Sequence, residues 1–267
     1  MQMYSFLSLF LLNKSLKFVN IYFTILIFIK LDAIDSTNDY LKQLSKKNKL
    51  ENFTTVIANE QTNGRGQMGS SWVSDAGKNI IMSILVSDLK YSSSSIFDWN
   101  VIVSLAVAKA LEEANVPNIS IKWPNDIMAD SKKVGGILIE NSLKQDESFD
   151  SIIGIGINVN QENFNDLPKA TSLKNKTNKT YNVTEISEKI ALNIQAYYLL
   201  KDDMLPIFWQ NYHQRLFRKG IPTTFEDQKG NRFMGIIQSI TRDGKLQLIL
   251  ENDTVAKYSL KEIQMLF

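Results

Sequence analysis

The segment from Ile152 to Asn160 constrains the fold of this chain more than any other, because alternate residues along it differ sharply in size. Its sequence, IIGIGINVN, alternates isoleucine or valine with glycine or asparagine. Successive side chains of a strand point to opposite faces, so one face would be apolar and the other nearly bare. A floor of Gly154 and Gly156 suits a planar ligand, and it equally suits a helix that crosses the strand closely. Both interpretations stay open at this point.

Four other segments have strand patterns. Thr54–Asn59 leads into a glycine-rich loop and Asn79–Val86 leaves it. In Ile119–Trp123 the alternation directs Lys122 away from the apolar side chains, and Pro124 ends the strand because it lacks an N–H group. Val134–Glu140 is apolar at both odd and even positions, as in a strand covered on both faces. Gly135 and Gly136 leave room beside its backbone. These patterns predict one central sheet.

The helical patterns surround these strands. Ser36 is predicted to cap a helix that has Tyr40, Leu41 and Leu44 on one side. Asn100–Ala114 is apolar on nearly all sides and is predicted to pack in the centre of the domain. Thr184–Leu200 is amphipathic, and Pro206–Phe217 continues in helical spacing. His213, the only histidine, is expected to be a surface or packing residue.

The pattern changes at Gly220. Short strand-like runs follow, separated by turn signals at Asp227–Asn231, Asp243-Gly244 and Asn252-Asp253. We therefore predict a small all-β domain over residues 219–267, after a larger domain over residues 25–218.

Composition excludes several classes of protein. The chain has 267 residues, 44% of them hydrophobic, which suits a globular protein with a real core. Its formal charge is +2 without a dense basic segment, so nucleic acid is not expected as a partner. There is no cysteine, which excludes disulfides and thiolate metal sites and fits a reducing compartment. We expect a cytoplasmic protein.

The first residues are unusually apolar. The runs Tyr4–Leu12 and Phe18–Ile29 are each shorter than the roughly 18 residues that a spanning helix needs. No positive charge precedes them and no A-x-A cleavage pattern follows, so neither a membrane partner nor secretion is expected. We predict a buried first strand over Ile25–Leu31 and an extension without assigned function over residues 1–24.

The loop GRGQMGSSW, Gly64–Trp72, has the composition of an anion site. Its glycines allow backbone N–H groups to converge on an anion, and Arg65 adds a planar charged fork. No Lys-Ser/Thr pair follows, so it is not a P-loop. Gln61, Gln67 and Trp72 add hydrogen-bonding and stacking groups. Together with KWPNDI at Lys122–Ile127 and KVGGILIE at Lys133–Glu140, this loop predicts a site for a flat ligand that carries phosphate.

These motifs, with Ser36-Thr37-Asn38 and GIGINVN, resemble biotin protein ligases in order and spacing, including a lysine eleven residues after the first lysine of KWPND. The resemblance spans about residues 29–267. It implies an α+β fold, a mixed sheet flanked by helices as in class II synthetase-like biotin/lipoate ligases, with a C-terminal SH3-like barrel. It also implies ATP-dependent attachment of biotin to a lysine of the biotin carboxyl carrier protein of acetyl-CoA carboxylase, through biotinyl-5'-AMP.

The resemblance assigns roles by matching position. Catalysis would fall to Arg65, Lys122, Asp126 and Lys133, with Asp126 orienting the acceptor amine. Biotin would contact Ser36, Thr37, Asn38, Gln61, Gly64, Arg65, Gly66, Gln67, Lys133, Gly135 and Gly136. The adenylate would contact Arg65, Trp72, Lys122, Asn125, Asp126 and Asn158. Mg²⁺ would be bound mainly through the ATP phosphates, with no dedicated protein metal site.

Two departures and three alternatives remain. The family commonly has arginine at the position of Gln67 and often a basic residue at that of Ser70, so retention of the adenylate would depend more on Arg65, Lys122 and Lys133.

A repressor would need a DNA-binding winged helix before Ser36, and the apolar segment there lacks the basic residues for one. A lipoate or octanoyl ligase or transferase of the same fold is the enzymatic alternative, and a biotin-binding protein with a dead site is the non-enzymatic one. The chain is expected to be a monomer or a homodimer.

Overall fold

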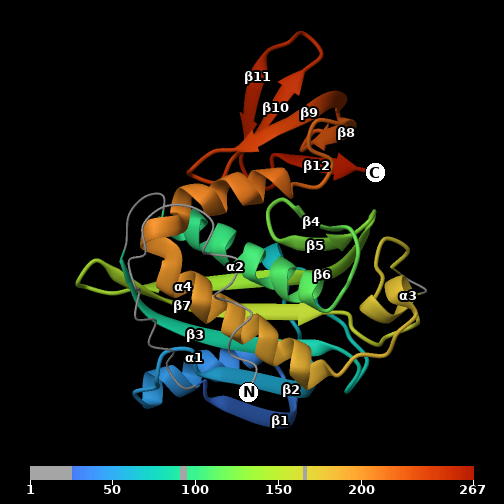
Figure 1. The fold of residues 1–267 in the computed structure, drawn as a ribbon. Helices are drawn as coiled ribbons and strands as arrows, with labels where there is room; N and C mark the ends of the chain where they lie inside the picture. The colour runs from blue at the N-terminus through green and yellow to red at the C-terminus, as the bar shows by residue number, and fades with distance from the viewer. Residues whose placement is uncertain (1–25, 91–94, 165–166) are drawn as a thin grey trace, which may run out of the picture.

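The computed structural model describes residues 26–90, 95–164 and 167–267, and the extension expected over residues 1–24 lies outside them. Within these residues the larger domain contains a seven-stranded mixed sheet of order β1-β2-β3-β7-β6-β5-β4 (Figure 1). β1 and β2 are parallel, and the other neighbours are antiparallel. Its strands are β1 (Phe28–Ile34), β2 (Thr55–Gln61), β3 (Ile80–Lys90), β4 (Ile119–Lys122), β5 (Asp126–Ala129), β6 (Lys132–Leu143) and β7 (Ser148–Ile157).

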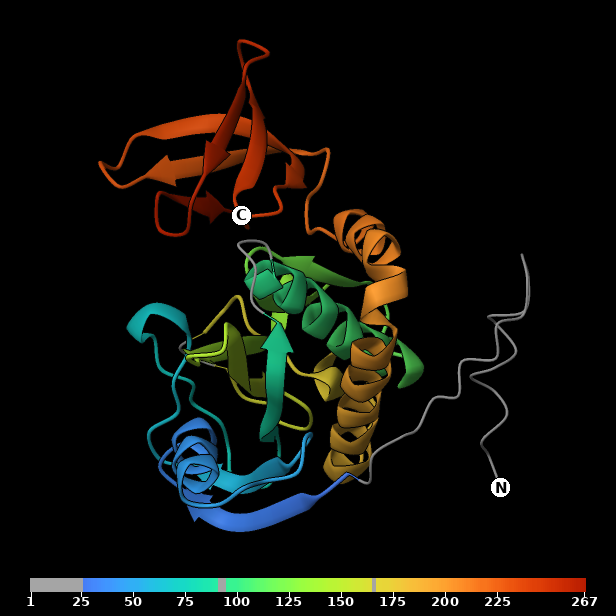
Figure 2. The same cartoon turned by 90° about the vertical axis from the view of Figure 1, so that its left-hand side faces the viewer.

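Helices cover both faces of this sheet (Figure 2). α1 (Thr37–Lys47) packs on β3 and β7 from one side, and α2 (Ser95–Glu113) and α4 (Val183–Gln214) pack together on the other. A short helix, α3 (Leu173–Thr177), lies beyond the end of β7. Apolar residues of α2 and three isoleucines of β7, Ile153, Ile155 and Ile157, belong to one buried cluster. The prediction of a central helix is confirmed, since burying apolar side chains all round requires a covered position.

The predicted first strand is wrong in its bounds and its burial. The strand runs over Phe28–Ile34 rather than Ile25–Leu31, and its residues are half-buried or exposed. Among the described strands its backbone pairs with β2 alone, so it forms an edge of the sheet that these strands make. Ile29 and Leu31 still pack against the small cluster under α1, which explains the apolar sequence.

α4 is one helix where two helical segments are predicted. It includes Pro206, which lacks the N–H group that would complete the helical ladder. Figure 1 shows that α4 changes direction in its later half. Proline is a recognised cause of such kinks, and here the kink carries the helix from the larger sheet toward the C-terminal strands.

The C-terminal strands form a second, antiparallel sheet of order β11-β10-β9-β8-β12. This sheet is consistent with the expected SH3-like domain, and the boundary near residue 219 stays a prediction. It contacts the larger domain, since Trp123 Nε1 donates to Gly244 O at 2.9 Å. Its strands are β8 (Pro222–Asp227), β9 (Arg232–Ile240), β10 (Leu246–Leu250), β11 (Val255–Tyr258) and β12 (Ile263–Leu266).

Across the described part of the chain, the helices are too short or too polar to cross a membrane.

Candidate functional site

Strand pairing brings two glycines together in the middle of the large sheet. Gly136 on β6 is the register partner of Gly156 on β7, and Gly136 is also paired with Asp126, which is paired with Lys122. Paired residues project on the same face of a sheet. The row therefore has a bare centre with charged groups at one end.

A pocket of about 640 Å³ opens over this row. Its walls come from the start of α1, the glycine loop, the turn between β4 and β5, and the C-terminal domain. The volume lies within the range of about 300–1,000 Å³ that is usual for small-molecule sites.

The two glycines of β7 have different reasons to lack a side chain. A Cβ atom at Gly154 would lie 2.5 Å from Asn38 Oδ1, so this glycine admits the first turn of α1. A Cβ atom at Gly156 would overlap the indole of Trp72 from the glycine loop. The helix-crossing interpretation therefore holds at Gly154. At Gly156 the ring on the floor is that of the protein's own Trp72, and the planar ligand stays a prediction.

The start of α1 is buried at the pocket. Ser36 caps the helix as predicted, since its hydroxyl accepts from Asp39 N at 3.3 Å. The backbone N–H of Thr37 donates to Gln61 Oε1 at 2.9 Å, which ties α1 to the end of β2. These contacts hold the polar side chains of the helix start in fixed positions.

Ser83 joins these groups and was not predicted as a site residue. Its hydroxyl lies 2.8 Å from Thr37 Oγ1 and 2.6 Å from Asn38 Oδ1, and the side chain is fully buried. A serine inside the apolar run of β3 is the sequence signal that could have identified it, because a buried hydroxyl requires a partner.

The glycine loop folds back on itself. Trp72 N donates to Gly64 O at 2.8 Å, and Gly66 N donates to Ser70 O at 2.6 Å. A Cβ atom at Gly64 would clash with Trp72 O, and Gly69 has a φ of 83°, which favours glycine. The glycines therefore set the path that carries Arg65, Gln67 and Trp72 to the pocket.

Arg65 is held by two carboxylates. Its Nη2 atom lies 2.6 Å from Asp39 Oδ1 and 3.1 Å from Glu140 Oε2. Sequence reasoning assigned neither acid to the site, although Glu140 ends the KVGGILIE motif and Asp39 follows Ser36-Thr37-Asn38.

Two lysines meet one carboxylate at the opposite end of the floor. Asp126 Oδ1 lies 2.6 Å from Lys133 Nζ, and its Oδ2 lies 3.3 Å from Lys122 Nζ. Asn125 Nδ2 donates to Ile137 O at 2.6 Å and fixes the turn that carries Asp126. Lys133 Nζ also lies 5.8 Å from the centre of a Trp72 ring. Three charged groups thus gather at one end of the pocket and carry a net charge of +1.

Three of the predicted site residues lie outside the pocket lining. Gly135 is on the opposite face, where its missing side chain makes room for Ile157. Asn158 is buried and donates to Thr171 O at 3.1 Å. Gly64, the first residue of the glycine loop, packs against Gln61 and Trp72. The other predicted residues line the pocket together: Ser36, Thr37, Asn38, Gln61, Arg65, Gly66, Gln67, Trp72, Lys122, Asn125, Asp126, Lys133 and Gly136.

The C-terminal domain supplies a wall that was not predicted. Lys261, Gln264 and Met265 line the pocket, and the ring of Phe267 lies 5.4 Å from Lys122 Nζ. No motif marks these residues, because only the docking of the two domains brings them to the site.

The described residues contain no group of three or more His, Cys, Asp or Glu side chains arranged to hold a metal ion. Asp126 is the only acidic residue among those that line the pocket, and it is already paired with two lysines.

Comparison with known proteins identifies relatives of this chain. Residues 31–158 match the model of the biotin/lipoate A/B protein ligase family. The bifunctional ligase/repressor BirA of Bacillus subtilis is 31% identical over 247 residues, 88% of this chain and 72% of that protein. The biotin–[acetyl-CoA-carboxylase] ligase of Mycobacterium tuberculosis is 28% identical over 207 residues, 75% of this chain and 74% of that protein.

A solved structure extends the likeness to the whole fold. The biotin protein ligase of Aquifex aeolicus, in complex with biotin and ATP, superposes with a TM-score of 0.74 at 26% identity, covering 90% of this chain and 98% of that one. The bifunctional ligase/repressors of Bacillus, Escherichia coli and Salmonella are longer, and the chain spans 39% to 72% of their length. The chain therefore belongs to the biotin/lipoate A/B protein ligase family, and it is an enzyme of the biotin protein ligase kind.

Proposed function

We propose that this chain joins biotin to a specific lysine of the biotin carboxyl carrier protein of acetyl-CoA carboxylase, in two steps through biotinyl-5'-AMP. The observation that carries the proposal is the row from Lys122 to Gly156, which places two lysines and a carboxylate at the end of a flat floor. Biotin and ATP are the ligands of the Aquifex aeolicus enzyme with the same fold.

In the first step the biotin carboxylate would attack the α-phosphate of ATP, forming the acyl–phosphate bond and releasing pyrophosphate. Lys122, Lys133 and Arg65 would offset the charge that gathers at phosphorus, because fixed cations act strongly where water is excluded. The hydrogen-bonded groups at the other end, Thr37 and Gln61 among them, would hold the polar head of biotin.

In the second step a lysine amine of the carrier would attack the acyl carbon and displace AMP. Asp126 would orient that amine and take part in removing its proton. Trp72 would cover the adenylate and shield the mixed anhydride from water, as closing loops do in other enzymes.

The pocket fits Mg²⁺ only as a companion of ATP. Its single lining carboxylate, Asp126, is engaged with Lys122 and Lys133. Mg²⁺ bound through the ATP phosphates would supply charge neutralisation, and the protein would contribute Asp126 and Asn125 near it. The absence of cysteine supports a cytoplasmic reaction.

The decisive experiment incubates the full chain with ATP, Mg²⁺ and a purified biotin carboxyl carrier domain, and weighs the carrier after addition of biotin, lipoate or octanoate. Biotin alone should add its acyl mass to the carrier, with release of pyrophosphate. Modification by lipoate or octanoate instead would favour the alternative ligase. If none of the three acids leads to release of pyrophosphate, both functions are rejected.

A further inference from the structure

Glu140 joins two groups that come from different parts of the chain. Its Oε2 atom lies 3.1 Å from Arg65 Nη2 in the glycine loop and 2.7 Å from Asn38 Nδ2 in the first turn of α1. We propose that Glu140 is a positioning residue, whose carboxylate fixes Arg65 and Asn38 relative to each other and so holds the glycine loop over the floor.

The contacts of Arg65 are arranged for such a role. The guanidinium forms ion pairs with Glu140 and with Asp39, and Nη2 makes both of them. Among the described residues, no side chain is bonded to Nε or Nη1 of Arg65, and the residue lines the pocket. A guanidinium anchored by one nitrogen keeps its other donors available for the oxygens of a bound acid or phosphate.

The contact with Asn38 extends this order to the helix. Asn38 Oδ1 accepts from the buried hydroxyl of Ser83, so its amide orientation is fixed and its Nδ2 faces Glu140. A hydrogen-bonded path thus runs from Gln61 through the backbone N–H and the hydroxyl of Thr37 and the hydroxyl of Ser83 to Asn38. Asn38 and Arg65 both donate to Glu140, which joins the path to the loop. Glu140 is the point at which this path reaches the loop.

Burial distinguishes the two acids that hold Arg65. The side chain of Glu140 is 23% exposed, whereas that of Asp39 is 37% exposed. Asp39 is bonded to Arg65, whereas Glu140 is bonded both to Arg65 and to Asn38. Because exposed ion pairs contribute little, Glu140 should dominate the positioning.

The experiment compares Glu140→Gln with Glu60→Gln in the full chain. Glu60 is an exposed strand residue near the same loop, so its substitution removes a charge without touching Arg65. Hydrogen exchange of the backbone amides of residues 64–72 is measured without ligands, and the KM for biotin and the kcat are measured alongside. We expect Glu140→Gln to speed exchange of the loop about tenfold, because hydrogen bonds to charged groups are the strong ones. Exchange in β3 and β7 should stay unchanged.

The catalytic effect rests on the proposed function, and the exchange result does not. We expect kcat/KM for biotin to fall about tenfold, because Arg65 serves both biotin binding and the charge at phosphorus in the proposed function. In an Arg65→Ala background, Glu140→Gln should have no further effect. Unchanged loop exchange in a folded Glu140→Gln protein, or effects that add to those of Arg65→Ala, would overturn the proposal. If faster exchange occurs without biotin turnover in the parent chain, only the proposed function fails.

Asp39→Asn serves if Glu140→Gln does not fold. It should speed exchange of the same loop by a smaller factor, since one of the two anchors of Arg65 remains. Loop exchange equal to that of the parent chain would count against anchoring of Arg65 by carboxylates.

Discussion

Lys133 Nζ and Asp126 Oδ1 are 2.6 Å apart, although the register partner of Asp126 on β6 is Gly136. The long lysine side chain reaches back along the bare floor, since Gly136 has nothing to block it. The ammonium group therefore lies over the floor and near Trp72, while the side chain stays 36% exposed.

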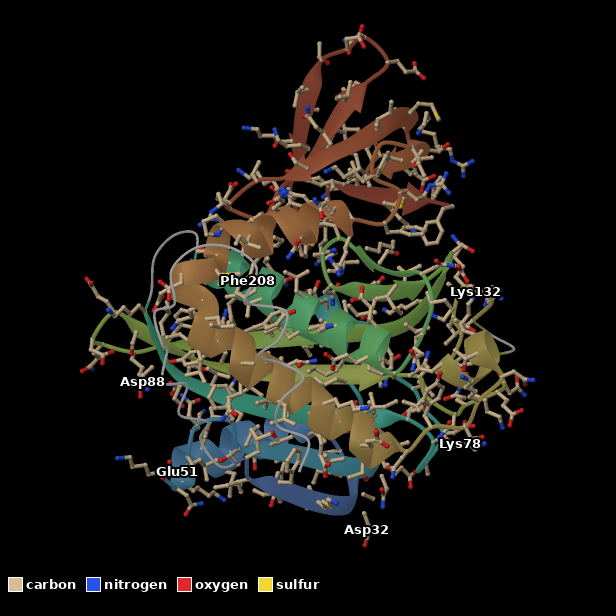
Figure 3. The ribbon with its side chains drawn as sticks, in the orientation of Figure 1. Asp32, Glu51, Lys78, Asp88, Lys132 and Phe208 are labelled. Carbon is tan, nitrogen blue, oxygen red and sulfur yellow. The ribbon has the colours of Figure 1, made fainter. Side chains whose placement is uncertain are left out.

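Replacing Lys133 by methionine should slow formation of the adenylate about 100-fold, the loss seen when one fixed donor is removed from a charged transition state. ATP- and biotin-dependent pyrophosphate release measures it. Lys132→Met is the matched control, because Lys132 is exposed and lies at the outer edge of the molecule in Figure 3. A rate for Lys133→Met within about threefold of the control would remove Lys133 from the chemistry.

Replacing Asp126 by asparagine should affect the second step more than the first. We expect transfer from preformed biotinyl-5'-AMP to the carrier to slow about 100-fold, since general base catalysis contributes on this order. Single-turnover transfer measures it. Asp130→Asn is the control in the turn that follows β5, where Asp130 is exposed and paired with Lys176. Equal losses in both steps would show that Asp126 acts on ATP chemistry instead.

Gln67→Arg should slow release of biotinyl-5'-AMP about tenfold, because a second guanidinium on the loop can bond the phosphate. Gln67 lines the pocket next to Arg65, so the new charge would face the ligand. Adenylate release is followed after rapid dilution, and Gln228→Arg on the exposed surface controls for added charge. No change in release would indicate that Arg65, Lys122 and Lys133 suffice.

Gly156→Ala should destabilise the protein by about 1–3 kcal/mol, as overpacking does, because the new Cβ would overlap Trp72. Gly136→Ala should change the free energy of unfolding by less than about 0.5 kcal/mol, since its Cβ would lie at least 3.5 Å from its neighbours. Urea unfolding of both variants gives the comparison. Equal stabilities would mean that Trp72 does not rest on Gly156 in solution.

His213 should make stability fall in mild acid. Its Nε2 lies 3.0 Å from Ile240 O, between α4 and the C-terminal sheet, and burial lowers the pKa of His213 from 6.5. The folded protein then binds a proton less readily than the unfolded chain, so the stabilisation is complete above pH 6.5 and is lost as pH falls through the folded pKa.

Thermal unfolding at about pH 7.5 and about pH 5.5 tests this, because no other histidine titrates in the chain. On acidification, the melting temperature of the His213→Gln variant should fall less than that of the parent protein. Equal falls in the two proteins would assign the acid sensitivity to other groups.

Local sequence patterns predicted most of the elements, and the resemblance to biotin protein ligases supplied most of the residues that line the pocket. Alternation identified β4 and β7, the all-apolar helix pattern placed α2 at the centre, and the turn signals indicated the small β domain. These patterns succeed because side-chain periodicity follows backbone geometry, which acts over a few residues. The motif residues also proved to line one pocket, with the exceptions of Gly64, Gly135 and Asn158.

The tertiary structure alone decided which faces meet. Parity along β6 puts Gly136 on the floor and Gly135 on the core side, yet two adjacent glycines in a strand covered on both faces do not reveal which is which. The roles of Ser83 and Glu140, the edge position of β1 and the wall formed by Lys261 and Met265 depend on contacts between distant segments. Such contacts are set by packing and strand order, which no local pattern encodes.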